Sequence, residues 1–264
     1  MRNVFQKALW DQRRNLPFWA SGVALVVLLE AALWPSMSDM ASLDDYLQDL
    51  PPALREVFSL DQMATGSGFL NAELFTLVLP MIFLVFAINR GARMVAGEEE
   101  AGTLDLLLVT PLSTTRLLVQ EAAALTLSII ALGAAVFGAT MVGGRLFGLG
   151  ISVAAAVVGA TALVLLGVEF GILALVIGAL TGRRGLAIGA PTALVMAAYL
   201  LFVAGALVDG LAAWRGFSPF DQALHSGPLS PQVPASFAWL VLPPLLALLV
   251  ALPLWSRRDI GTAR

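Results

Sequence analysis

Six stretches of the chain are apolar over about the 20 residues that an α-helix needs to cross a lipid bilayer. They cover residues 16–34, 74–92, 117–142, 151–181, 186–208 and 237–255. Each is expected to be helical, because any other backbone exposed to lipid would leave its amides without hydrogen-bond partners. Hydrophobic residues make up 59% of the sequence and charged residues only 12%, a balance typical of membrane proteins. The sequence therefore predicts an all-α polytopic membrane protein with six transmembrane helices in one domain, 1–264.

The basic residues predict the orientation of these spans, since cytoplasmic loops are enriched in lysine and arginine. With a cytoplasmic N-terminus, 12 of the 15 basic residues fall on the cytoplasmic side, and only Arg55, Arg145 and Arg215 fall outside. We therefore expect a multi-pass protein of the cell (inner) membrane with both termini in the cytoplasm.

Three segments lie outside the spans and the loop at 97–110. Residues 1–15 place apolar side chains at helical spacing among basic ones, which predicts an interfacial helix along the inner leaflet. Residues 35–73 and 209–236 are expected to form extracytoplasmic loops. The first contains SLDDYLQDLPPALREVF, which predicts short helices broken at Pro51 and Pro52.

The sequence lacks the residues of most catalytic sites. Lys7 is its only lysine and no GxxxxGK[ST] loop surrounds it, so the chain cannot bind a nucleotide in that way. His225 is its only histidine and there is no cysteine, which excludes a histidine or thiolate metal site and a hydrolytic triad. A net charge of −3 argues against a nucleic-acid partner. We expect a non-catalytic membrane subunit that draws energy from a gradient or from another polypeptide.

The densest charge cluster lies in GEEEAGTLDLLLVTPL, residues 97–112, between the second and third spans. The spacing predicts an amphipathic helix over 97–110 with its leucines on one face, its glutamates in the first turn, and an end before Pro111. Because anionic headgroups repel glutamate, this helix is expected to dock in a protein groove and not on lipid. An unengaged surface helix is the alternative.

The same segment resembles the signature of ABC transporter permeases of the type-2 exporter family (ABC-2 type membrane domain). LPMIFLVFAINRGARMVAGEEE also resembles the second span of that family, and WSRRDIGTAR resembles its usual ending after the sixth span. The residues that match the family's coupling helix are Glu98, Glu99, Glu100, Gly102, Thr103, Leu104, Leu107, Leu108, Pro111 and Leu112.

The resemblance implies both partners and a mechanism. The coupling helix would sit in a cytoplasmic ABC ATPase subunit, and a second permease copy or a related permease would complete the membrane part. ATP and Mg²⁺ would bind the ATPase, so that this chain needs no cofactor. Membrane lipid surrounds the spans, and the scarcity of charge in them suggests a hydrophobic or amphiphilic cargo, such as a drug, natural product or lipid-like molecule.

Several residues within the spans are candidates for a translocation path or a switch between states. Glu169 is the carboxylate nearest the middle of a predicted span, and such residues usually face the protein interior or water. A buried packing role is equally open for it. Phe83, Phe86 and Asn89 of the second span are further path candidates, with ordinary packing as the alternative for the aromatic residues.

Pairs of glycines four residues apart predict close helix packing. These are Gly167 and Gly171, Gly178 and Gly182, and Gly185 and Gly189.

Two other functions remain open from the sequence. A gradient-driven secondary transporter would use Glu169 for proton coupling. A mechanical membrane subunit would pass ATPase motion to an extracytoplasmic partner without moving a solute.

Overall fold

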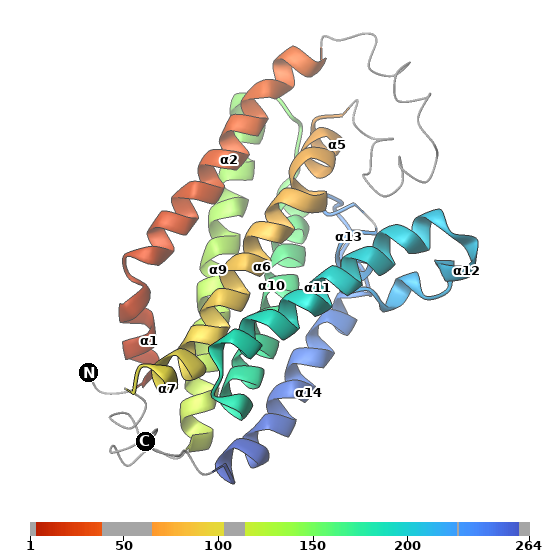
Figure 1. Ribbon diagram of the computed structural model, residues 1–264. Coiled ribbons are helices and arrows are strands. Elements are labelled where there is room, and N and C mark those ends of the chain that lie inside the picture. The colour runs from red at the N-terminus through yellow and green to blue at the C-terminus, as the bar shows by residue number, and fades with distance from the viewer. Residues whose placement is uncertain (1–3, 39–64, 103–113, 226, 259–264) are drawn as a thin grey trace.

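The computed structural model describes residues 4–38, 65–102, 114–225 and 227–258 (Figure 1). Within these residues the chain is helical and has no β-strand, which confirms the predicted all-α class. Six helices are long and apolar enough to cross a membrane, as predicted. They are α2 (Asn15–Ser38), a composite helix from α5 to α7 (Gly66–Glu100), α9 (Thr114–Leu146), α10 (Val153–Thr181), α11 (Arg184–Leu207) and α14 (Phe237–Ser256).

The second spanning helix is much longer than the predicted stretch 74–92. It joins five segments end to end, two of them π-helical. They are α5 (Gly66–Leu70), the π-helix η2 (Asn71–Val78), α6 (Leu79–Ala92), the π-helix η3 (Arg93–Gly97) and α7 (Glu98–Glu100). The prediction ended the span at Ala92, whereas the helix continues through the buried Met94, Val95 and Ala96 and closes with the three glutamates.

The predicted helix over 97–110 does not form as one element. α7 ends at Glu100, and Gly102 has a φ of +67°. This left-handed conformation ends a helix, and glycine adopts it at little steric cost. Glu98, Glu99 and Glu100 therefore close the long second helix instead of opening a new one. The rest of the predicted coupling segment, including Thr103, Leu104, Leu107, Leu108 and Pro111, lies outside the described residues, so its role stays a prediction.

The N-terminal segment forms the helix α1 (Val4–Gln12), which packs against α9. Ala8 and Gln12 are buried in this contact, whereas Trp10 is 53% exposed, with the Arg13 guanidinium 3.7 Å from its ring centroid. α1 thus has a protein-facing side and an exposed aromatic side. Its position at a membrane surface stays a prediction.

The segment between α11 and α14 is more ordered than the predicted loop. It contains α12 (Asp209–Ala212), the 3-10 helix η4 (Arg215–Phe217) and α13 (Pro219–Leu224). Ser218 caps α13 at Phe220 N and donates a 2.8 Å hydrogen bond to Ala198 O of α11. The helices expected within 35–73 fall on residues 39–64, outside the described part of the chain.

α10 lies at the centre of the bundle, in contact with α6, α9, α11 and α14 (Figure 1). In its most apolar window 67% of the residues are buried, against 17% for α2 and 22% for α11 and α14. A helix that is apolar on all sides is suited to such a central position. The outer helices thus leave most of their apolar surface open to lipid or to another subunit.

The closest approach between α6 and α10 is at Gly91. A Cβ built there would overlap the carbonyl oxygen of Gly171 and lie 3.1 Å from Leu175 N. Since backbone atoms cannot move aside cheaply, the two helices would have to separate.

We expect Gly91→Ala to lower the free energy of unfolding by about 1–3 kcal/mol, the usual cost of overpacking. The thermal midpoint of the protein in detergent measures this change. Gly138→Ala in α9 is the matched control, because a Cβ there meets nothing within 4 Å among the described residues. That control should gain about 0.5–1 kcal/mol from helix propensity. Equal midpoints for the two variants would contradict the assigned helix contact.

Candidate coupling site

Three consecutive glutamates at the end of the second helix contact three different helices. Glu98 Oε1 lies 2.9 Å from Lys7 Nζ of α1. Glu100 Oε1 accepts a 2.8 Å hydrogen bond from the backbone N–H of Arg184, the first residue of α11. Glu99 pairs with Arg258, which lies two residues beyond the end of α14. Successive side chains on a helix point about 100° apart, so adjacent residues reach separate neighbours.

The Glu99–Arg258 pair is the most enclosed of the three contacts, with side chains 17% and 23% exposed. It is bidentate: Arg258 donates to Glu99 Oε1 over 2.6 Å and to Oε2 over 3.0 Å. Arg258 also donates a 2.7 Å hydrogen bond to Ala179 O near the end of α10. One guanidinium therefore joins the second helix, α10 and the chain that follows α14.

Gly182 leaves room for this ion pair. It ends α10 with a φ of +64°, and a Cβ there would overlap Arg258 and lie 2.6 Å from Glu99 Oε1. Any larger residue would displace the pair. In the structure Gly182 therefore lies in the turn after α10, directly against the ion pair, and not in a contact between two helices.

The glutamates lie at the opposite end of a helix from the one expected from the sequence, so the helix dipole acts on them in the opposite sense. Carboxylates were expected in the first turn of a helix, where the helix dipole favours them, but these three lie in a last turn, where it does not. Lys7 and Arg258 supply the compensating charge to two of them. Glu100 is favourably placed toward α11, whose N-terminal amide it binds. We call Glu98, Glu99 and Glu100 with these contacts the glutamate junction.

The sequence did not identify the partners in this junction. Lys7 and Arg258 carry no local motif, and which cation meets which acid depends on how distant helix ends come together. The only available signal was that three adjacent acids require nearby cations.

The candidate path residues lie in different environments. Phe83 is fully buried, and Gly167 of α10 packs beside it, so its place in a translocation path stays a prediction. Phe86 packs edge-on against Trp19, with ring centroids 5.6 Å apart. Asn89 is exposed and donates to Val85 O of its own helix. The junction and these residues do not form one site.

Glu169 is only 8% exposed, and its Oε2 has no hydrogen-bond partner among the described residues. Glu169 is not in the wall of the cavity that contains Arg90 and Trp19, of the cavity that contains Glu98 and Glu121, or of the apolar cavity between α9 and α10.

The glycine pairs differ in their surroundings. A Cβ would meet Ile129 at 3.1 Å from Gly167, Ala87 at 3.1 Å from Gly171, and Ala96 at 3.3 Å from Gly178. These three glycines face closely packed neighbours. At Gly185 and Gly189 a Cβ would meet nothing within 4 Å among the described residues, so the packing role of these two stays a prediction.

A comparison with protein families gives one match. Residues 2–260 match the family described as "ABC-2 family transporter protein". No curated protein and no solved structure matches the chain.

Proposed function

The chain belongs to the ABC-2 family of transporter proteins, and from this membership we propose that it couples a separate ATPase subunit to the export of a hydrophobic or amphiphilic substrate. A permease of this family is the membrane component of an ABC transporter. The proposal adds the coupling site, the direction and the class of cargo.

The glutamate junction is the observation that supports coupling most directly. It immediately precedes the segment that resembles the family's coupling helix, with only Ala101 and Gly102 between them. A displacement of that segment by an ATPase would act on Glu98, Glu99 and Glu100, and through them on α1, α11 and the end of α14. One short segment could thereby move α1 and the spanning helices α11 and α14 together.

The partners follow from the same proposal. Two permeases, identical or related, pair in the cell (inner) membrane above two ATPases that bind ATP and Mg²⁺. The bundle end with α1 and the glutamate junction faces the cytoplasm, as the distribution of basic residues predicts. ATP drives the switch only because it favours one state of the assembly over the other.

The two other functions considered from the sequence have less support. A gradient-driven carrier would need Glu169 in a hydrated path, but this carboxylate is buried among its neighbours in the bundle. A purely mechanical subunit would need an extracytoplasmic partner for residues 35–73, most of which lie outside the described residues.

Purification of the tagged chain from its native membrane in mild detergent tests the proposal. We expect an ATPase with a nucleotide-binding loop to accompany it, and vesicles containing both to accumulate an amphiphilic dye only when ATP is supplied. Vesicles with a hydrolysis-deficient ATPase are the control. Transport by this chain alone, driven by a proton gradient without ATP, would contradict the proposal.

A further inference from the structure

A polar cavity of about 180 Å³ lies between α1, α6 and α9, near the glutamate junction. Its volume is well above the roughly 15 Å³ that one water molecule requires. The charged residues in its wall are Lys7, Asp11, Arg90, Arg93, Glu98 and Glu121.

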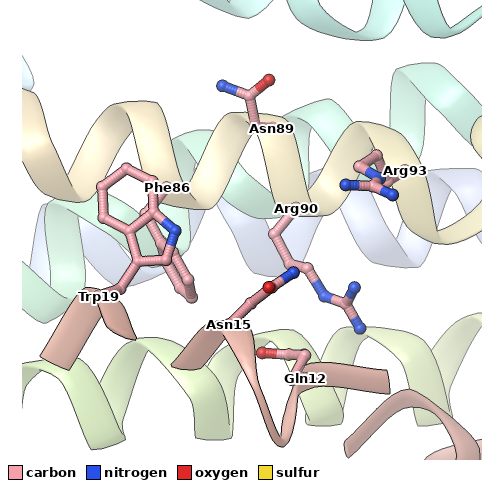
Figure 2. Close-up of a pocket in the computed structure, with 7 residues that line it drawn as sticks. All are labelled: Gln12, Asn15, Trp19, Phe86, Asn89, Arg90 and Arg93. Atoms are coloured by element: carbon pink, nitrogen blue, oxygen red, sulfur yellow. The ribbon is translucent and has the colours of Figure 1, made fainter. Parts of the chain in front are cut away.

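A second cavity of about 110 Å³ shares Asn15, Arg90 and Arg93 with the first. Figure 2 shows Arg90 extending from α6 toward Gln12 and Asn15, with Trp19 and Phe86 beside them. The two cavities are therefore adjacent: charged residues dominate the wall of the first, and the second contains the aromatic side chains of Trp19 and Phe86.

Only some of the charges in this space are paired within the chain. Lys7 lies 2.9 Å from Glu98 and 3.8 Å from Asp11. Arg90, in contrast, binds neutral oxygens. It donates a 2.9 Å hydrogen bond to Ala8 O, and the amide of Gln12, oriented with its oxygen toward Arg90, accepts from it over 2.9 and 3.0 Å.

Neither Glu121 nor Arg93 forms an ion pair with another residue that the structure describes. Glu121 is only 4% exposed, lines the cavity, and has an Oε2 atom with no hydrogen-bond partner among the described residues. Arg93 is exposed, lines both cavities, and forms no ion pair within the described part of the chain. A buried polar atom without a partner is costly, so a group from outside the chain would stabilise it.

The mixture of charges restricts the chemistry of that group. A purely anionic ligand would meet Glu121, Glu98 and Asp11, and a purely cationic one would meet Arg90 and Arg93. A zwitterion satisfies both sets when its cationic group donates hydrogen bonds to Glu121 and its anionic group accepts them from the guanidinium of Arg93.

The position of the cavity identifies the source of the zwitterion. It lies at the ends of spanning helices, and the adjacent cavity contains the half-buried Trp19, a residue type enriched at the headgroup level of membranes. We propose that this cavity binds the headgroup of a phospholipid with a primary ammonium, such as phosphatidylethanolamine. The ammonium binds Glu121, and the phosphate binds Arg93 with Arg90 behind it. The site is independent of an ATPase partner and of the direction of transport.

Native mass spectrometry of the purified protein tests this site, with mixed micelles of phosphatidylethanolamine, phosphatidylcholine or phosphatidylglycerol. We expect preferential retention of phosphatidylethanolamine, since the quaternary ammonium of phosphatidylcholine has no N–H to donate and phosphatidylglycerol has no cation. Glu121→Gln should reduce that retention about tenfold, as expected for the loss of one charge-assisted hydrogen bond. Glu169→Gln is the matched control, because it makes the same substitution at another buried glutamate that does not line this cavity.

Arg93→Gln provides a second test in a position that is exposed and therefore does not threaten folding. It should also weaken phosphatidylethanolamine retention, while size-exclusion profiles of all variants stay unchanged. Excess soluble phosphoethanolamine, which lacks acyl chains, should displace little lipid. Equal retention of phosphatidylethanolamine and phosphatidylcholine, or equal effects of Glu121→Gln and Glu169→Gln, would overturn the proposal, as would retention unchanged by Arg93→Gln.

Discussion

Glu99→Arg is expected to abolish ATP-driven transport and to destabilise the folded protein. The substitution places a second guanidinium against Arg258, in a contact where both native side chains are more than three-quarters buried. Removing one partner of a buried ion pair typically costs 3–5 kcal/mol, so we expect up to about 3 kcal/mol for this partly buried one. The measurements are the thermal midpoint in detergent and ATP-dependent transport in vesicles.

Exchanging the two residues of the Glu99–Arg258 pair tests whether opposite charge alone is sufficient, or whether the native hydrogen-bond geometry is also needed. Glu99→Arg combined with Arg258→Glu restores opposite charges, so it should recover part of the stability and transport. Recovery should be incomplete, because the exchanged carboxylate cannot donate to Ala179 O. Glu100→Gln is the control: it keeps an acceptor for Arg184 N–H at an exposed position and should retain nearly full activity. A double variant no better than Glu99→Arg alone would contradict a direct ionic contact.

The second large effect is expected from Leu104→Glu combined with Leu107→Glu. These leucines share one face of the segment that resembles the coupling helix, and carboxylates on that face would have to be desolvated on docking. We expect ATPase retention on the purified permease to fall at least about tenfold, with loss of ATP-driven transport. The permease itself should be recovered from membranes at the wild-type yield.

Asp105→Asn is the matched control for the leucine variant, since that side chain is predicted to point away from the leucine face. It alters charge in the same segment and should leave ATPase retention unchanged. Normal retention by the leucine variant would show that another surface carries the contact with the ATPase.

The sequence predicted the six spans because lipid imposes a simple rule on them: about 20 apolar residues in helical form. It failed where the chain leaves the membrane. The extension to Glu100 has only the short apolar run 94–96 between an arginine and three glutamates, too short to show that the helix continues. Gly102 separates the glutamates from the leucines by its left-handed conformation. Glycine can adopt this conformation but can also continue a helix, so the sequence alone did not show that the helix ends there.

The segment before α14 contains a local sequence pattern that indicates a helix. Ser218, Pro219 and Asp221 are typical of a helix start, with a capping hydroxyl, a proline at the first position and an acid in the first turn. Their order correctly indicates α13. The pairing of Glu99 with Arg258, in contrast, joins residues more than 150 positions apart and depends on the packing of α10 between them.

The glutamate junction also limits how this region can change during evolution. Inserting or deleting one residue upstream of Glu98 would rotate all three carboxylates by about 100°, so that each would face the wrong neighbour. Related chains should therefore exchange aspartate, glutamate or glutamine at these positions more readily than they alter the spacing to the second span. Insertions and deletions should instead accumulate beyond Gly102, because a change of length after the end of the helix does not rotate the three glutamates.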